Sequence, residues 1–116
     1  MYKIILDTDF LLTSIKFKVD IFSEINRICE FNYTLHIIDK TLDELKNKKL
    51  ENIALKLIEK LNIIKTNKDK TVDDLILELK EDNLIVATQD QELKKRLKKE
   101  NIQIITIRQK NHLSLN

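Results

Sequence analysis

The chain alternates short apolar runs with longer segments of helical periodicity, and this alternation restricts its fold more than any other feature. A run of three to six apolar residues predicts a strand that is buried on both faces, as in a parallel sheet. The segments between the runs repeat apolar residues at the spacing of amphipathic helices. We therefore predict an α/β fold, a three-layer sandwich with a central five-stranded parallel sheet. The expected strands are residues 3–6, 33–38, 63–65, 84–88 and 102–107.

The chain has no glycine and no proline among its 116 residues. Without glycine it can form neither a phosphate-cradling P-loop nor the glycine fingerprint of dinucleotide-binding domains. Asparagine tolerates the left-handed conformation that often follows a helix, so we expect it to end helices here. The residues in such positions are Asn32, Asn62, Asn83 and Asn101.

Length and cysteine content set further bounds. The length fits one domain, residues 1–116. The net charge of +2 does not by itself require a nucleic-acid partner. The lone Cys29 excludes an internal disulfide, favours a reducing cytoplasmic location and is expected to be a buried apolar residue. No apolar stretch approaches the roughly 18 residues of a membrane span and no signal peptide is visible, so we expect no membrane association.

Four acids occupy matching positions along this alternation. Asp7 directly follows the first strand, Glu44 and Asp73 lie in the first turns of the helices after the second and third strands, and Asp90 follows the fourth strand. Ligands of open α/β sheets bind beyond the carboxyl ends of the strands. We therefore expect the four carboxylates to converge on one cleft, with raised pKa values when no cation is present.

A cluster of carboxylates is tolerable when a cation neutralises it, and oxygen ligands favour Mg²⁺ or Mn²⁺. No set of cysteines and histidines has the spacing of a zinc site. A site of this kind suits the hydrolysis of phosphodiester bonds. Asp7, Glu44, Asp73 and Asp90 are the candidate catalytic residues, and all except Glu44 are expected to share one metal ion. Asp9, Asp74, Glu92 and Thr88 are candidates for supporting this set.

Helix capping is the alternative interpretation of the same acids. The segment from Thr41 to Glu44 fits a capping box, the segment from Thr71 to Asp74 has a similar form, and Asp90 can cap the helix that follows it. Capping explains these acids singly. It does not explain Asp7 at the end of an apolar strand together with three acids at matching positions.

Basic residues follow Asp90 directly. Lys94, Lys95 and Arg96 can flank the acidic cleft and contact a nucleic-acid backbone, although a solvated helix face is the ordinary role of such residues. Further lysines lie near the same edge of the predicted sheet: Lys16 and Lys46 as candidate RNA-binding residues, with Lys18, Lys48 and Lys49 beside them. The residues after the fifth strand are expected to form a polar tail, in which His112 has no visible partner.

The order Asp7, Glu44, Asp73, Asp90 resembles that of the PIN-domain nucleases, over roughly residues 3–110. The resemblance implies a five-stranded parallel sheet between helices, binding of Mg²⁺ or Mn²⁺, and hydrolysis of RNA to 5′-phosphate and 3′-hydroxyl ends. Residues 7–10, 14–20, 73–74 and 86–96 resemble more closely the branch of the endonuclease of the eukaryotic small-subunit processome and its archaeal relatives. This branch implies structured precursor ribosomal RNA as substrate, with ribosome-assembly proteins and a second copy of the chain as candidate partners.

One departure from the family pattern concerns the charge of the site. Asp9 stands where the family usually has asparagine, and this extra charge either tightens metal binding or hinders the approach of the substrate.

A toxin-type PIN ribonuclease is the alternative enzyme, although the matches at 14–20 and 73–93 favour the processing branch. A non-catalytic scaffold that binds RNA or protein is the alternative outside enzymes. Loss of an acid would mark a scaffold, and all four acids are present.

Overall fold

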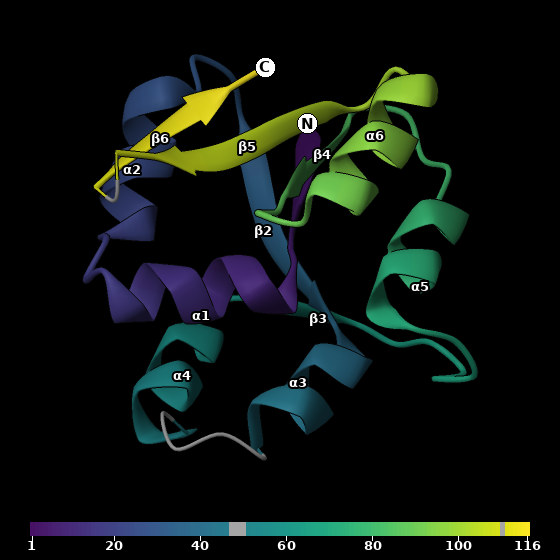
Figure 1. Cartoon of the computed structure of the whole chain (residues 1–116), viewed down its shortest axis with the longest axis horizontal. Helices are drawn as coiled ribbons and strands as arrows, with labels where there is room; N and C mark the ends of the chain where they lie inside the picture. Colours follow the sequence, from purple (N-terminus) through teal and green to yellow (C-terminus); the bar gives the residue numbers. More distant parts are fainter. Residues whose placement is uncertain (47–50, 110) are drawn as a thin grey trace.

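The computed structural model describes residues 1–46, 51–109 and 111–116, whose strands form a single mixed sheet (Figure 1). The order across the sheet is β3-β2-β1-β4-β5-β6, in which the first five strands run parallel. This arrangement confirms the predicted α/β class and its five parallel strands. Their bounds are β1 Tyr2–Leu6, β2 Tyr33–Ile38, β3 Asn62–Ile64, β4 Leu84–Ala87, β5 Gln103–Arg108 and β6 His112–Leu115.

Helices cover both faces of the sheet, because successive side chains of each buried strand point to opposite faces. Ile4 of β1 packs into the cluster that holds Phe10 of α1, whereas Ile5 packs into the cluster that holds Ile76 of α5. The three predicted layers are therefore present. On the first face lie α1 (Thr8–Lys16), α2 (Ile21–Ile28), α3 (Asp39–Lys46) and α4 (Glu51–Ile58); on the second lie α5 (Val72–Glu78) and α6 (Gln91–Lys99).

The predicted polar tail is wrong, because β6 pairs antiparallel with β5. Leu113 stands opposite Ile107 and is buried in the core. The segment alternates apolar and polar residues over only four positions, which is a weak sequence signal for a strand. It forms a strand here because β5 offers an edge with which it can pair. His112 also has a partner, since its Nδ1 lies 3.9 Å from the carboxylate of Glu24.

Asparagine adopts the predicted left-handed conformation at only two of the four positions where we expected it to end a helix. Asn83 and Asn101 have φ angles of 60° and 59°, so the prediction is confirmed for these two. It is wrong for Asn32 and Asn62, neither of which has a positive φ. Asn62 instead begins β3, where its side-chain amide donates to the carbonyl of Leu35 over 3.1 Å.

Several smaller predictions concern single residues. Cys29 is buried as expected, and burial raises the pKa of its thiol. Lys48 and Lys49 fall at 47–50, outside the described residues. Within the described part of the chain, no helix is both long and apolar enough to cross a lipid bilayer.

Candidate active site

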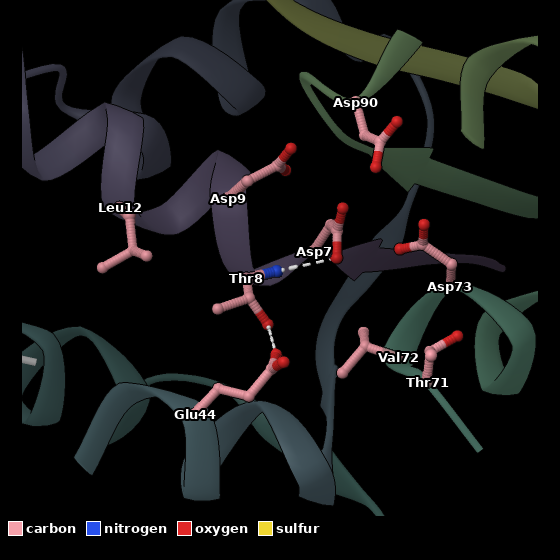
Figure 2. A pocket seen from close by; sticks show the side chains of 9 residues that line it. All are labelled: Asp7, Thr8, Asp9, Leu12, Glu44, Thr71, Val72, Asp73 and Asp90. Carbon is pink, nitrogen blue, oxygen red and sulfur yellow. Dashed lines mark hydrogen bonds between the residues drawn. The ribbon is translucent and has the colours of Figure 1, made fainter. Parts of the chain in front are cut away.

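A cleft of about 470 Å³ opens where β1 and β4 end and α1, α5 and α6 begin (Figure 2). The four acids predicted from the sequence all face it, from four different elements. Asp9, in the first turn of α1, adds a fifth carboxylate. The lining consists of Asp7, Thr8, Asp9, Leu12, Glu44, Thr71, Val72, Asp73 and Asp90.

Asp7 is held at the join between β1 and α1. Its backbone N–H continues the sheet by donating to the carbonyl of Ala87 over 2.9 Å, and its side chain then caps α1. The residue is only 4% exposed. One oxygen accepts from the backbone N–H of Thr8 at 2.9 Å, and the other accepts from the hydroxyl of Thr88 at 2.8 Å. Two donors therefore fix the direction of a buried carboxylate.

Thr88 connects three of the acids. Its hydroxyl lies 3.4 Å from Asp9 Oδ1 in addition to its short bond to Asp7, and it accepts the backbone N–H of Asp90 over 3.1 Å. The side chain is completely buried. Thr88 and Asp9 therefore both lie beside Asp7, and the supporting role given to them stays a prediction.

The crowding of the carboxylates changes the pKa values of two of them. Burial, followed by the charge of Asp9, raises the pKa of Asp7 to about 8. Burial, followed by the charge of Asp90, raises the pKa of Asp73 to about 6. The acids act on one another in two pairs, since Asp9 raises the pKa of Asp7 and Asp90 raises that of Asp73. The predicted rise is confirmed for Asp7 and Asp73.

Glu44 reaches the cleft from α3 and contacts α1. The hydroxyl of Thr8 donates to its carboxylate over 2.6 Å and lies 3.1 Å from the buried hydroxyl of Thr41. The capping-box interpretation is wrong here, because α3 begins at Asp39, before Thr41. Sequence reasoning missed Thr8 and Thr41, although the position of Thr8 directly after Asp7 was an available signal.

Two of the predicted caps do form. Asp90 accepts from the backbone N–H groups of Glu92 and Leu93 at 2.9 and 3.2 Å, and Thr71 accepts from that of Asp74 at 3.2 Å. Capping does not remove Asp90 from the cleft, because α6 begins at its wall. The positive ends of α1, α5 and α6 all lie at the cleft, where they partly offset its negative charge.

Residues 4–110 match the PIN-like domain family. The chain belongs to that family. It is 31% identical to ribonuclease VapC4 of Methanocaldococcus jannaschii over an alignment of 127 positions. The alignment covers 99% of this chain and 97% of the relative. The structure of the PIN domain endonuclease Utp24 matches with a TM-score of 0.84 and 24% identity, covering 99% of this chain and 91% of the other, a likeness of fold.

The loop before α5 positions Asp73 in this PIN-like domain. Asp39, at the start of α3, accepts from the backbone N–H and the hydroxyl of Thr66 at 2.8 and 2.6 Å. Lys68 forms an ion pair of 2.9 Å with Asp43 of the same helix. The loop is therefore bound to α3 at two points, and this brings the first turn of α5 to the cleft.

The basic residues of α6 point in different directions. Arg96 forms an ion pair of 2.9 Å with Asp74, Lys95 lies 3.8 Å from Glu92, and Lys94 donates to the hydroxyl of Thr106 over 2.7 Å. Lys16 and Lys46 lie in the last turns of α1 and α3. None of these candidates for RNA binding lines the acidic cleft, nor do the proposed supporting residues Asp74 and Glu92.

The side chains do not form a finished metal site. In the described residues, no three acidic, imidazole or thiol groups stand close enough together to hold a metal ion. The expectation that Asp7, Asp73 and Asp90 share one cation is therefore not met by the side chains as they stand. Mg²⁺, however, usually takes one or two protein carboxylates and completes its shell with water and substrate phosphate. The five carboxylates that line the cleft are hard oxygen donors, which fit a cation of that kind.

Proposed function

We propose that this PIN-like domain is an endoribonuclease that depends on a divalent cation, Mg²⁺ or Mn²⁺, and hydrolyses RNA phosphodiester bonds. The observation that carries the proposal is the buried Asp7, whose pKa is raised to about 8, in a cleft with four further carboxylates. Acids with perturbed pKa values in a cleft are typical of functional sites. The names ribonuclease and endonuclease carried by two similar proteins support the same class.

The proposed roles follow from where each side chain is held. Asp7, Asp73 and Asp90 would supply carboxylate oxygens to the cation. Thr88 holds Asp7 in place, and the same hydroxyl lies 3.4 Å from Asp9. Glu44, anchored by Thr8 on the opposite wall, is placed to accept a hydrogen bond from the attacking water. When bound, the cation lowers the pKa of a water ligand and offsets charge on the phosphate oxygens.

Chelation distinguishes this proposal from a non-catalytic scaffold. We expect the purified chain to cut structured RNA internally in Mn²⁺, to stop in EDTA and to resume when metal is restored. The products should carry 5′-phosphate and 3′-hydroxyl ends. RNA binding without cleavage under every metal condition would overturn the enzyme and favour the scaffold.

Two substrates follow from different similarities. The motifs at 14–20 and 86–96, which resemble the processing branch, support precursor ribosomal RNA. The full-length similarity to ribonuclease VapC4 supports a toxin-type ribonuclease equally well. A processing enzyme should cut a precursor ribosomal transcript at one site, whereas a toxin should arrest growth when it is expressed alone. Cleavage of precursor without growth arrest would decide for processing.

The remaining expectations concern partners and location. Ribosome-assembly proteins and a second copy of the chain are the proposed protein partners, and the reducing cytoplasm is the proposed location. Two large apolar side chains, Ile53 and Ile63, are 53% and 46% exposed, which gives a self-association measurement some motive. Sedimentation equilibrium should detect a dimer, and a monomer at all concentrations would remove that partner.

A further inference from the structure

A second hollow, of about 280 Å³, lies between α6 and β5 on the other side of Gln89 from the acidic cleft. We call it the basic pocket. Three cations line it, together with side-chain amides and a hydroxyl. Its main polar lining residues are Lys94, Lys98, Arg108, Gln89, Gln91 and Thr106.

The charges of the basic pocket are not neutralised. No acidic side chain belongs to its lining, which also includes Asn116. Within the described residues none of Lys94, Lys98 and Arg108 forms an ion pair with a carboxylate. Burial lowers the pKa of Lys94, and the neighbouring charge of Arg108 lowers it further. Three mutually repelling cations in one hollow favour an anion between them.

A neighbouring hollow between α5 and α6 provides the contrast. It has four cations but also three acids in its lining. Arg96 is paired there with Asp74, and Lys70 is paired with Glu78. Its charges are largely satisfied within the protein. The basic pocket is therefore the better site for an external anion.

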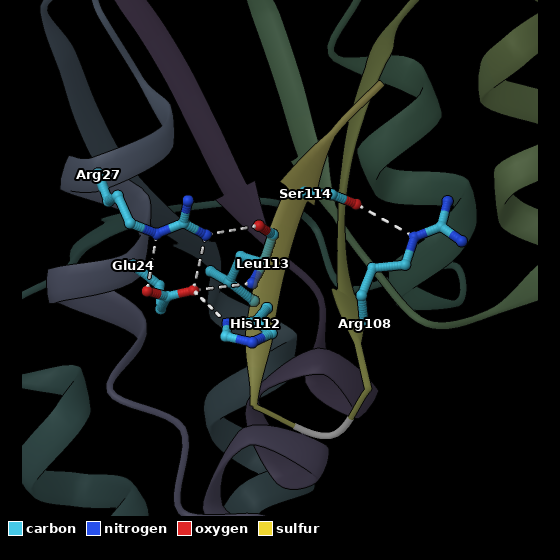
Figure 3. A network of polar contacts seen from close by, with 6 residues as sticks. All are labelled: Glu24, Arg27, Arg108, His112, Leu113 and Ser114. Carbon is cyan, nitrogen blue, oxygen red and sulfur yellow. Dashed lines mark hydrogen bonds and ion pairs between the residues drawn. The ribbon is translucent and has the colours of Figure 1, made fainter.

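The donors of the basic pocket are held in place by neutral groups. Lys94 donates to the hydroxyl of Thr106, which in turn donates to the side-chain carbonyl of Gln89, both over 2.7 Å. An ammonium group has three donors, so two remain for a ligand. Arg108 donates through Nε to the hydroxyl of Ser114 at 3.2 Å, and its terminal nitrogens donate to no described residue (Figure 3).

The basic pocket and the acidic cleft share a wall. The backbone N–H of Gln89 lies 3.4 Å from Asp9 Oδ1, and Asp9 lines the cleft. The charge of Asp9 also acts on Lys94, although it attracts less strongly than Arg108 repels. A polymer with regularly spaced phosphates that enters the cleft would pass this wall.

We propose that the basic pocket binds a phosphate of the same RNA strand whose neighbouring phosphodiester bond is cut in the acidic cleft. This inference rests on the proposed function and adds to it a second phosphate position. Arginine and lysine donors suit phosphate oxygens, and contacts to phosphates fix the register of a strand without reading its bases. The pocket therefore contributes affinity that does not depend on sequence, and it holds the strand across a cleft that would otherwise repel it.

The test measures binding without catalysis. A fluorescent single-stranded oligouridine is titrated in EDTA at several salt concentrations against wild type, Lys98→Gln, Arg108→Gln and the double variant. Lys99→Gln is the matched control, since it removes the same charge one residue along α6, in the hollow that also contains acids. We expect about tenfold weaker binding for the double variant. The slope of log affinity against log salt should fall by about 0.7 for each lost contact, and Lys99→Gln should keep the wild-type slope.

The outcomes distinguish a failure of the basic-pocket proposal from a failure of the proposed nuclease function. If the double variant keeps the wild-type affinity and salt slope, the inference is wrong, whether or not the protein cuts RNA. If it binds inorganic phosphate less well but RNA unchanged, the pocket takes free phosphate and the inference is again wrong. If wild type cuts no RNA in Mn²⁺ while the double variant still loses RNA affinity, the proposed function fails and the phosphate-binding pocket stands.

Discussion

The hydroxyl of Thr88 donates to the carboxylate of Asp7 across 2.8 Å, although 81 positions separate the two residues in the sequence. They meet because β1 and β4 pair in parallel, with Leu6 beside Ala87, so the residues that follow the two strands emerge at the same edge. The same hydroxyl accepts the backbone N–H of Asp90. One buried threonine therefore sets the direction of Asp7 and links it to the start of α6.

Replacing Thr88 with valine should reduce RNA cleavage by about 10- to 100-fold, the usual effect of losing a group that orients a metal ligand. Valine keeps the shape of threonine, but it removes one of the two donors to Asp7 and leaves the N–H of Asp90 without the hydroxyl that accepts it. Single-turnover cleavage in Mn²⁺ measures the effect. Thr88→Ser retains the hydroxyl and is the control. Wild-type cleavage by Thr88→Val would contradict the role given to this bond.

The stability of the metal-free protein should fall as pH rises. The folded state raises the pKa of Asp7 from 3.8 to about 8, so folding favours its protonated form. The contribution of this group to the free energy of unfolding is complete below about pH 4 and is lost as pH rises through about 8. Asp73, with a pKa of about 6, acts in the same direction over a lower range.

Asp7→Asn tests this pH dependence. Asparagine cannot ionise, so the variant should lose less stability with rising pH than wild type and should melt at a higher temperature at pH 8. Thermal unfolding in EDTA across this range provides the measurement. A variant whose stability falls as steeply as that of wild type would show that Asp7 is not the group responsible.

Divalent cations should stabilise the folded chain, because a cation that binds the native cleft and not the unfolded chain adds its binding free energy to folding. At about 100 times the Kd this amounts to about 2.7 kcal/mol. Wild type should therefore melt at a higher temperature in millimolar Mn²⁺ than in EDTA, and Asp7→Asn should gain much less. An unchanged melting temperature of wild type would count against a metal site.

The edge strand β6 is secured by an ion pair on α2 (Figure 3). Glu24 accepts the backbone N–H of Leu113 at 3.0 Å, and Arg27, which is paired with Glu24, donates to the carbonyl of Leu113 at 3.2 Å. Glu24→Ala should therefore lower the melting temperature by about 5 °C while leaving RNA cleavage unchanged. Glu30→Ala, at an exposed position, is the control. Equal melting temperatures for the two variants would show that the ion pair does not secure β6.

The parallel sheet and the convergence of the acids could be predicted because both depend on local pattern. Short apolar runs fix the strands, and each of Asp7, Glu44, Asp73 and Asp90 has a fixed position relative to the end of a strand. Parallel pairing then brings those ends to one edge. The side-chain spacing within the cleft could not be predicted, since it depends on contacts such as that of Thr8 with Glu44 across 36 positions.

The directions of the basic side chains could not be predicted from the sequence either. Lys94, Lys95 and Arg96 are consecutive on α6, and consecutive helical residues point about 100° apart. They therefore cannot face one cleft together. The structure places Lys94 in the basic pocket, beside Thr106, and Arg96 on Asp74. Which of them meets the substrate depends on the neighbouring elements, which periodicity does not specify.

The most direct test of the account is RNA cleavage by Asp7→Asn in Mn²⁺, measured together with RNA binding in EDTA. Asparagine preserves the shape of the side chain but removes the charge that the cation needs, so cleavage should fall to background. Binding in EDTA should match that of wild type below about pH 8, where Asp7 is mostly protonated, and exceed it at higher pH, where the ionised carboxylate repels phosphate. Cleavage by Asp7→Asn at the wild-type rate would contradict the assignment of the acidic cleft as the active site.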